Sequence, residues 1–448
     1  MTYAEAIAFL NSLARFGWRL GLDRMEALCE RLGHPERTFA SVQLTGTNGK
    51  GSTATFLAGI LQAAGLRTGL YTSPHVYTGR ERIQIDGAMI TEGEVAEIVQ
   101  ALLPHIEAVN KQRGPVTEFE AWTMVMFVHF HRQGVQTAVI EAGLGGRWDS
   151  PNVVPSRLGI ITNVSLDHTD RLGSTIREIA RDKAGIIKPG GKVLIGQLTP
   201  EAADEVVLEA AAASAKVFVL RSHDALWTLP AYGTEQFEWE SEGDSGIALT
   251  LPDGARTSTL YQGASYQARN AALAAAAAEI LIQDGYLISS GAVKTGLACQ
   301  APGRFEVIRT CPEVILDGAH NPAAAAVLAA ELARGRTTPY PDGIPEGETP
   351  DLRLVFGGSS GHDVEGCLKI LAPLAVEVIL TRARNPRSRD PKELARFLEG
   401  LEADCIVIPD VPAALGMAIE RSRPFDRICV TGSFFVLGEI PRPLPPMS

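Results

Sequence analysis

The residues best suited to chemistry stand together in Leu44–Thr53, which reads LTGTNGKGST. Backbone N–H groups in a glycine-rich loop bind phosphate, the Lys50 ammonium adds a positive charge, and the Ser52 hydroxyl is a ligand that Mg²⁺ accepts. The spacing departs from the general pattern G-x-x-x-x-G-K-[ST], because Gly51 separates the lysine from the serine. We interpret the stretch as a phosphate loop, since a plain glycine-rich turn would explain neither the lysine nor the helix predicted after it.

The segments on either side of this loop supply the elements that a phosphate site needs. Residues 41–45, SVQLT, are short and partly β-branched, which predicts a strand. Residues 54–65, ATFLAGILQAAG, place apolar side chains on one helical face and end at Gly65, which predicts a helix with a glycine stop. A strand, a glycine loop and a helix N-terminus together direct backbone N–H groups and the helix dipole at one anion.

Three further polar residues stand at the ends of predicted strands. They are Ser73 after a short strand, Glu141 at the end of the predicted buried strand 135–141, and His168 after the predicted buried strand 158–164. Because the carboxyl ends of parallel strands share one edge of a sheet, we expect these residues near the phosphate loop. Glu141 is then a predicted magnesium ligand, and a solvated surface glutamate is the alternative. For His168, metal ligation and a polar loop position both stay open.

Two basic residues lie in the same half of the chain. Arg147 follows the glycines of AGLGGR, where the backbone is able to approach a ligand closely, and its guanidinium is suited to a carboxylate or phosphate. Lys183 lies in an amphipathic helical pattern, where a salt bridge is the simplest role.

The second half of the chain offers three more candidates. Asp317 and His320, in DGAHNP, stand between a predicted strand and a predicted helix. Asp317 is therefore expected either to cap the helix or to contact a ribose, and His320 to approach a phosphate. Arg304 follows a predicted linker, and we expect it either to reach across a cleft or to be a hinge arginine bound by surface carboxylates.

The composition limits the classes of protein that the chain represents. Its 448 residues exceed one ordinary core, and its net charge of −11 argues against nucleic acid as the main partner. The six cysteines are dispersed without a C-x-x-C pair, which favours reduced thiols over disulfides or zinc. We find no signal-peptide pattern and no apolar run of ~18 residues, so we expect a cytoplasmic protein without a membrane partner.

Successive apolar strands with helices between them predict an α/β fold with a parallel, doubly wound sheet. Residues 117–134 predict a helix, and residues 174–197 predict a helix, a turn and another strand; both helices open with capping boxes. Residues 200–265 predict a helix and a few antiparallel strands around a peripheral sheet, and 266–282 an alanine-rich, close-packing helix. A linker near 297–302 divides the chain into two predicted domains, 1–298 and 299–448.

The pattern restarts beyond the linker with five apolar segments: VILDGAHNP, LRLVFGG, VEVILT, CIVIPD and RICVTGS. They predict strands separated by helices, and therefore a second, smaller Rossmann-like domain.

Taken in order, the motifs resemble those of the folylpolyglutamate synthase/dihydrofolate synthase family, a branch of the Mur ligase superfamily. The resemblance covers nearly the whole chain, and Gly51, which spoils the general pattern, is what this family has. The motifs are LTGTNGKGST, YTSPH, TEFEAWT, EAGLGGRWD, NVSLDHTDRLGSTIREIARDKAGIIKPG, QARNAALAA, PGRFEV, LDGAHNP and VTGSFF.

The resemblance implies an ATP-dependent amide ligase with a P-loop Mur-ligase-type domain, residues 1–298, and a C-terminal ligase domain, residues 299–448. It implies that ATP phosphorylates a substrate carboxylate and that the amine of L-glutamate attacks the acyl phosphate. The implied substrates are dihydropteroate, tetrahydrofolate-type reduced folates, L-glutamate and ATP, and the implied cofactor is Mg²⁺, as one or two ions. It also implies that Lys183 is carbamylated to form a magnesium ligand, and that the protein is monomeric.

The resemblance assigns a role to each matching position. Catalytic roles fall to Lys50, His168, Lys183 and Arg304. Nucleotide contacts fall to Thr47, Asn48, Gly49, Lys50, Gly51, Ser52, Asn270, Arg304, Asp317 and His320. Magnesium ligands fall to Ser52, Ser73, Glu141 and His168, and positions near the pterin-type substrate to Phe119, Glu120, Arg147 and Asp149.

Two stretches depart from the family pattern. After GLGG the family commonly has R-x-D-A-T-N, and here Ser150 and Pro151 replace the alanine and threonine, which we expect to reshape the pterin pocket. After VFG the family usually has D-K-D, of which Asp363 alone is clearly kept. The second departure bears on glutamate or nucleotide contacts in the second domain.

Several alternative functions stay open. The chain would carry both the dihydrofolate synthase and the folylpolyglutamate synthase activities, or folylpolyglutamate synthesis alone. A muramoyl-peptide ligase would need a UDP-binding domain before the phosphate loop. Only 43 residues precede Leu44 in this sequence, which is too few for such a domain. A P-loop ATPase that acts as a switch or binding protein would leave DGAHNP unexplained.

Overall fold

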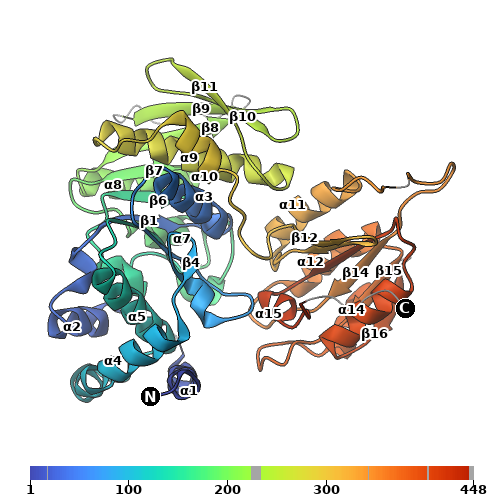
Figure 1. Cartoon of the computed structure of the whole chain (residues 1–448), viewed down its shortest axis with the longest axis horizontal. Coiled ribbons are helices and arrows are strands. Elements are labelled where there is room, and N and C mark those ends of the chain that lie inside the picture. Colours follow the sequence, from blue (N-terminus) through green and yellow to red (C-terminus); the bar gives the residue numbers. More distant parts are fainter. Residues whose placement is uncertain (18, 223–233, 342, 401–402, 443–448) are drawn as a thin grey trace. The chain divides into compact units, whose positions relative to one another are not determined.

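The computed structural model describes the chain except residues 18, 223–233, 342, 401–402 and 443–448 (Figure 1). Its contacts divide the chain into two compact units. The first unit comprises residues 1–262 and 267–300, and the second comprises 263–266 and 301–448. The main division falls two residues after the predicted boundary, and the inclusion of 263–266 in the second unit was not predicted. The roles expected of the two domains stay predictions.

The first unit is built on an eleven-stranded sheet with the order β11-β10-β9-β8-β7-β6-β1-β5-β2-β3-β4 in the part of the chain that is described. The seven strands from β9 to β2 in this order are parallel, and β3, β4, β10 and β11 are antiparallel. The sheet confirms the predicted α/β class. The strands are β1 Ala40–Thr45, β2 Thr68–Tyr71, β3 Ile83–Ile85, β4 Ala88–Met89, β5 Thr137–Glu141, β6 Leu158–Ile161, β7 Lys192–Ile195, β8 Lys216–Ser222, β9 Thr234–Glu242, β10 Gly246–Thr250 and β11 Arg256–Leu260.

The helix and the antiparallel strands predicted in residues 200–265 are present, as α8 (Pro200–Ala212) and as β9 to β11, but the prediction of a separate peripheral sheet is wrong. Strands β8 to β11 continue the main sheet, and β8 and β9 are parallel to their neighbours. The physical reason is that β8 is buried on both faces, with Phe218 in one core cluster and Val217 and Val219 in another, so it needs helices on both sides. Residues 223–233 of the predicted stretch lie outside the described residues.

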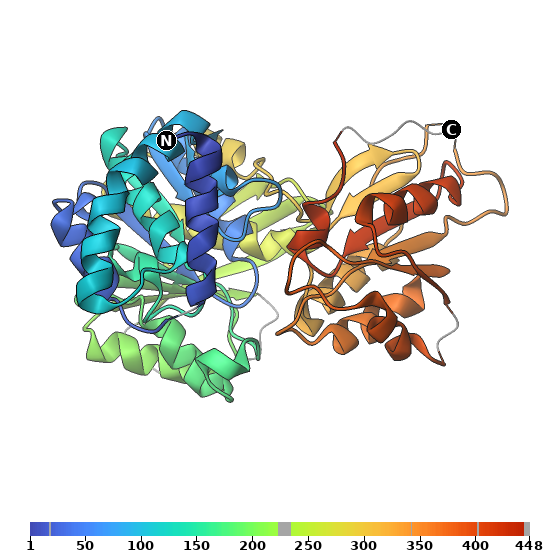
Figure 2. The same cartoon turned by 90° about the horizontal axis from the view of Figure 1, so that it is seen from below.

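Helices cover both faces of this sheet (Figures 1 and 2). Helices α3, α9 and α10 pack on one face. On the other face α1, α2, α4 and α5 form one core cluster and α7 and α8 another, and Figure 2 shows α1, α4 and α5 side by side. The helices are α1 Tyr3–Leu13, α2 Asp23–Arg31, α3 Lys50–Ala63, α4 Glu92–Arg113, α5 Glu118–Arg132, α6 Thr169–Leu172, α7 Ile176–Ala184, α8 Pro200–Ala212, α9 Ala268–Gln283 and α10 Ser290–Gly296.

Local signals in the sequence explain where the helices begin and how they pack. Helices α5 and α7 open with the predicted capping boxes, at Thr117 and Thr175. The alanine run of α9, residues 274–278, is fully enclosed and lies against α3, which confirms the predicted close-packing helix.

The second unit has its own six-stranded sheet, with the order β12-β13-β17-β14-β15-β16 among the described residues. All neighbours are parallel except β12 and β13, which confirms the predicted smaller Rossmann-like fold. Strand β12, which lies just past the predicted linker, is not among the predicted strands, because its partly exposed residues do not form an apolar run. The elements are β12 Glu306–Thr310, β13 Glu313–Leu316, β14 Leu352–Phe356, β15 Glu377–Leu380, β16 Asp404–Val407, β17 Arg427–Thr431, α11 Pro322–Ala333, α12 Val364–Leu371, α13 Pro391–Ala395, α14 Val411–Glu420 and α15 Phe434–Leu437.

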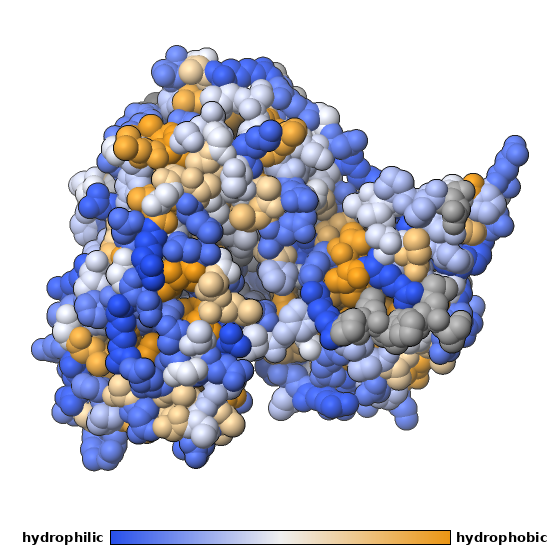
Figure 3. Space-filling model, in the orientation of Figure 1, coloured by the Kyte–Doolittle hydropathy of each residue, from blue (hydrophilic) through white to orange (hydrophobic). Residues whose placement is uncertain are grey.

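On the face drawn in Figure 3, hydrophobic residues lie in small patches between hydrophilic ones. Among the described residues, no helix combines the length and the apolar character that crossing a membrane requires.

Candidate active site

The loops that carry the predicted chemistry follow neighbouring strands of the first sheet. The strand order β6-β1-β5-β2 is uninterrupted, and these four strands are parallel. Leu44 of β1 is in register with Glu141 of β5, and Thr45 with Ile161 of β6. The loops after the four strands therefore leave the sheet at one edge, where ligands of doubly wound sheets bind.

The phosphate loop is shaped by a glycine at the start of α3. Gly49 occupies the N-cap with φ +81°, and a Cβ there would lie 2.4 Å from Oδ1 of Asn270, so only glycine fits. The helical ladder starts with the Thr53 N–H, which donates to the Gly49 carbonyl at 3.0 Å. The amides of residues 50–52 lie before that ladder and supply the donors that a phosphate group needs.

The loop is held by polar side chains at the end of β6. The Asn163 Oδ1 accepts from the amides of Thr47 and Asn48 at 3.2 and 2.8 Å, and the Thr162 hydroxyl donates to the Asn48 carbonyl at 2.7 Å. The Lys50 ammonium donates to the carbonyls of Gly46 and Thr47, at 2.9 and 3.1 Å. Sequence reasoning missed Thr162 and Asn163, although two polar residues directly after an apolar strand were a usable signal.

Glu141 is buried at the end of β5, with 2 % of its surface exposed, so the alternative of a solvated surface glutamate is wrong. Its Oε2 accepts from the Ser73 amide at 3.1 Å, which brings two predicted metal ligands together. His168 is the N-cap of α6 with φ +49°, and its Nε2 lies 3.9 Å from Oδ1 of Asp167.

Lys183 is buried on α7, with 3 % of its surface exposed, and it forms no ion pair within the described part of the chain. The alternative of a surface salt bridge is therefore wrong. Burial lowers the pKa of its ammonium to about 7, and the positive charge of Lys50 acts in the same direction. The carboxylates of Asp182, Asp167 and Asp149 oppose this shift, so charges of both signs act on the Lys183 ammonium.

Asp149 is enclosed in the loop after β5. Burial raises the pKa of its carboxyl to about 7, and its Oδ2 accepts from the Gly143 amide at 2.8 Å. Arg147 of the same loop binds the carboxylate of Glu209 at 2.6 Å. The Phe119 ring lies 6.1 Å from that of Tyr71. Asp149 and Arg147, which were both expected near the pterin-type substrate, therefore bind other groups of the protein in this structure.

Glu120, also expected near the pterin, has both carboxylate oxygens bound by protein groups. Oε1 accepts from Nε of Arg24 at 2.9 Å, and Oε2 accepts from the Thr117 amide at 2.7 Å. The Arg24 and Glu120 side chains are each 4 % exposed. A buried, hydrogen-bonded ion pair holds α5 against α2, and this is a structural role that motif matching did not indicate.

Arg24→Ala is expected to lower the free energy of unfolding by about 3–5 kcal/mol, because it leaves the Glu120 carboxylate buried without its cation. Urea unfolding followed by circular dichroism measures the change. Lys111→Ala, which removes an exposed pair with Glu107, is the control and should leave the midpoint unchanged. A midpoint for Arg24→Ala equal to that of the control would contradict the structural role.

In the second unit, Asp317 is buried and its two oxygens accept three hydrogen bonds. Oδ2 accepts from the Tyr266 hydroxyl at 2.8 Å and the Phe305 amide at 2.9 Å, and Oδ1 accepts from the Ala319 amide at 2.9 Å. Burial raises the pKa of this carboxyl. The alternative that Asp317 caps α11 is wrong, because Asn321 is the N-cap of that helix.

The other predicted residues of the second unit lie near the carboxyl ends of its strands. Nδ1 of His320 donates to the Gly318 carbonyl at 2.7 Å, and the His320 ring lies 4.6 Å from that of His362. The guanidinium of Arg304 lies 4.5 Å from the centre of the Phe434 ring. In the first unit, Asn270 donates from Nδ2 to Oε1 of Gln267 at 2.8 Å.

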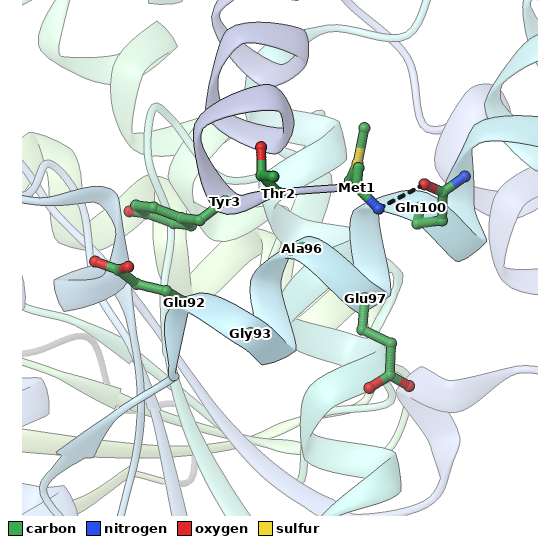
Figure 4. Close-up of a pocket in the computed structure, with 8 residues that line it drawn as sticks. All are labelled: Met1, Thr2, Tyr3, Glu92, Gly93, Ala96, Glu97 and Gln100. Carbon is green, nitrogen blue, oxygen red and sulfur yellow. Dashed lines mark hydrogen bonds between the residues drawn. The ribbon is translucent and has the colours of Figure 1, made fainter.

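One cavity of about 460 Å³ lies where the start of α1 meets the start of α4 (Figure 4). In Figure 4 the amino group of Met1 donates to Gln100, at 3.0 Å, and the Glu92 side chain points toward Tyr3, while that of Glu97 points away from Met1 in this view. None of the residues that line it is a predicted site residue. The lining residues are Met1, Thr2, Tyr3, Glu92, Gly93, Ala96, Glu97 and Gln100.

Two protein families match the two halves of the chain. Residues 44–278 match the Mur ligase middle domain, and residues 303–434 match the Mur ligase glutamate ligase domain. The parallel sheet with its phosphate loop and the second Rossmann-like unit are thus those of a Mur ligase.

The chain belongs to the dihydrofolate synthase/folylpolyglutamate synthase family. It is 39% identical over 447 residues to the dihydrofolate synthase/folylpolyglutamate synthase of Bacillus subtilis, covering 98% of each chain. It is 35% identical over 447 residues to a probable bifunctional folylpolyglutamate synthase/dihydropteroate synthase of Haloferax volcanii. That alignment covers 98% of this chain and 50% of the relative, so the chain spans about half the relative's length.

Solved structures of this family share the fold. A Mycobacterium tuberculosis folylpolyglutamate synthase complexed with ADP and AMPPCP is 31% identical, with a TM-score of 0.82 and 98% of each chain covered. A bifunctional folylpolyglutamate synthase/dihydrofolate synthase with Mn, AMPPNP and L-glutamate bound is 30% identical, with a TM-score of 0.80 and coverage of 98% and 97%.

Proposed function

We propose that this chain uses ATP to join L-glutamate to dihydropteroate and to reduced folates, as a bifunctional dihydrofolate synthase/folylpolyglutamate synthase. One observation carries the proposal. The phosphate loop, with Lys50 at its centre, leaves the same sheet edge as the buried Glu141, and Lys50 and Lys183 are close enough to influence each other's charge. Folylpolyglutamate synthesis alone is the second candidate, favoured by the name of the Mycobacterium tuberculosis structure.

The proposed reaction has two steps. A carboxylate oxygen of the pterin substrate attacks the γ-phosphorus of ATP, so a P–O bond forms, the bond to ADP breaks, and an acyl phosphate results. The glutamate amine then attacks the acyl carbon, so a C–N bond forms, phosphate leaves, and the amine loses a proton. The amides of residues 50–52 and the Lys50 ammonium are placed to stabilise the negative charge that moves in the first step.

We propose Mg²⁺ as the metal, held by Ser52, Ser73, Glu141 and His168. The Mn-containing relative supports a divalent cation, and three of the four proposed ligands offer the oxygen atoms that Mg²⁺ and Mn²⁺ prefer. The buried position of Glu141 fits this role, because a carboxylate out of water needs a cation or several donors. When bound, the ion would supply positive charge for the transferred phosphoryl group.

We also propose that Lys183 is carbamylated. An amine must lose its proton before its nitrogen attacks the carbon of CO₂, and the lowered pKa of Lys183 supports that reaction near neutral pH. The N–C bond forms as one proton leaves, and the lysine side chain changes from a cation to an anion that is able to bind metal.

We propose that the enzyme acts in the cytoplasm as a monomer on small molecules. Its net charge of −11 disfavours nucleic acid as a partner.

Release of ADP tests the proposal. Purified protein with ATP, MgCl₂ and L-glutamate is offered dihydropteroate, tetrahydrofolate or a UDP-muramoyl peptide in separate reactions. Stimulation by both pterin substrates is the expected result, and stimulation by tetrahydrofolate alone indicates folylpolyglutamate synthesis only. ADP release that is indifferent to glutamate and to pterins would show a P-loop ATPase and would refute the ligase.

A further inference from the structure

The side chain of Asn152 lies in the short turn Ser150–Val153, and both its amide nitrogen and its amide oxygen are hydrogen-bonded. Its Nδ2 donates to the carbonyls of Arg147 and Gly185, both at 3.0 Å. The Lys188 ammonium donates to Oδ1 of Asn152 at 2.8 Å and to its backbone carbonyl at 2.6 Å. All four groups lie in the first unit, and Asn152 is 7 % exposed.

The chemistry of the three partners fixes the orientation of the amide. A carbonyl only accepts, so both carbonyls require the NH₂ group, and an ammonium only donates, so it requires the oxygen. An amide has two N–H donors and one carbonyl oxygen, which match this demand. Neither a carboxylate nor a hydroxyl at residue 152 would satisfy all three partners.

The two carbonyls belong to the two segments that carry the candidate site. Arg147 lies in the loop that follows Glu141, and Gly185 stands two residues after Lys183, at the end of α7. The Arg147 amide also donates to the carbonyl of Asp182, at 2.9 Å. A Cβ on Gly185 would lie 2.3 Å from Cβ of Arg147, so the two segments are in close contact at this point.

Placing the charged ammonium of Lys188 in this buried position costs free energy. Burial lowers the pKa of its ammonium to about 8, and within the described part of the chain this ammonium forms no ion pair. The Lys188 ammonium is buried and binds both oxygens of one residue, Asn152. This arrangement indicates that the role of Lys188 is to hold Asn152 in place.

We propose that Asn152 and Lys188 form a buried brace that positions Lys183 relative to the loop after Glu141 for the ligation reaction, without contacting substrate. Asn152 is thus a positioning residue. This inference rests on the proposed function, because it assigns the brace to that same reaction. Geometry governs the step strongly, since a misplacement of ~1 Å changes an enzymatic rate by about 100-fold.

Asn152→Asp tests the brace, because it keeps the shape of the side chain but presents a carboxylate oxygen to a carbonyl. We expect kcat for ligation to fall about 10- to 100-fold, with the Kd of a non-hydrolysable ATP analogue changed by less than about threefold. The phosphate loop is not attached to Asn152, so nucleotide binding should survive. Hydrogen exchange should become faster in residues 143–149 and 183–187. Lys188→Met, which frees the amide to turn, should give a smaller change of the same kind.

Asn110→Asp is the matched control, because the Asn110 oxygen accepts from the Val116 amide at 2.7 Å and a carboxylate does the same. It should leave kcat and exchange unchanged. Equal kcat and exchange in Asn152→Asp and wild type would overturn the brace, as would a loss of ATP-analogue binding in step with kcat. An inactive wild type would instead refute the proposed function and, with it, the catalytic purpose of the brace.

Discussion

Lys50→Ala is expected to reduce kcat for ligation by roughly 10²- to 10³-fold, the usual effect of removing one preorganised charge from a transition state. The Lys50 ammonium lies over its own loop, donating to the carbonyls of Gly46 and Thr47. It is therefore held in the phosphate loop before any phosphate arrives, which is the arrangement that stabilises a moving negative charge without reorganisation. The measurement is the steady-state rate of ADP release with saturating glutamate and dihydropteroate.

The same substitution should leave the chain folded, because Lys50 contacts the loop and not a hydrophobic core. Thermal unfolding followed by circular dichroism is expected to shift by less than about 4 °C. Lys192→Ala, which removes an ammonium bound to Asp284 at the opposite end of the parallel strands, should leave kcat unchanged. If Lys50→Ala retained more than about a tenth of the wild-type rate, the loop would not be the phosphate site.

The phosphate loop and the strand-end residues were predictable because each depends on a short stretch of sequence. Glycine spacing, one lysine and a following helix define the loop, and an apolar run that ends in a charged residue defines the position of Glu141. The parallel sheet then follows from the alternation of strands and helices, and it places these ends at one edge. Local patterns were sufficient for residues whose position depends on a single loop or on the end of a single strand.

What the sequence did not indicate depends on residues far apart in the chain. The ion pair of Glu120 was not predicted, because its partner Arg24 is 96 residues away. Asn163 and Thr47 are 116 residues apart, and Lys188 and Asn152 are 36 apart. No local spacing predicts such pairs, because the fold alone brings them together. For the same reason the burial of Lys183, which excludes its salt bridge, could not be foreseen from an amphipathic pattern.

Lys183→Met is expected to have opposite effects on activity and stability. Ligation should fall by at least about 100-fold, since methionine provides neither an amine for CO₂ nor any charge. Stability should rise, because a methionine of similar length fills the site without a group that prefers water. Activity is followed as ADP release and stability by urea unfolding in buffer free of CO₂.

The pH dependence of stability distinguishes the removal of a buried ammonium from a nonspecific effect of the Lys183→Met substitution. The pKa of Lys183 is lowered from 10.5 to about 7 by folding, so between these values the unfolded chain binds more protons than the folded chain. The contribution of this group to the free energy of unfolding therefore rises with pH across that window. Its full destabilising effect is present below about pH 7.

The gain in the free energy of unfolding from Lys183→Met over wild type should be largest near pH 6 and shrink toward pH 10. Lys192→Met, an exchange at a partly exposed lysine, should show no such trend. A Lys183→Met protein less stable than wild type near pH 6 would mean that the ammonium has a compensating partner, and that it is not the poorly solvated amine on which carbamylation depends.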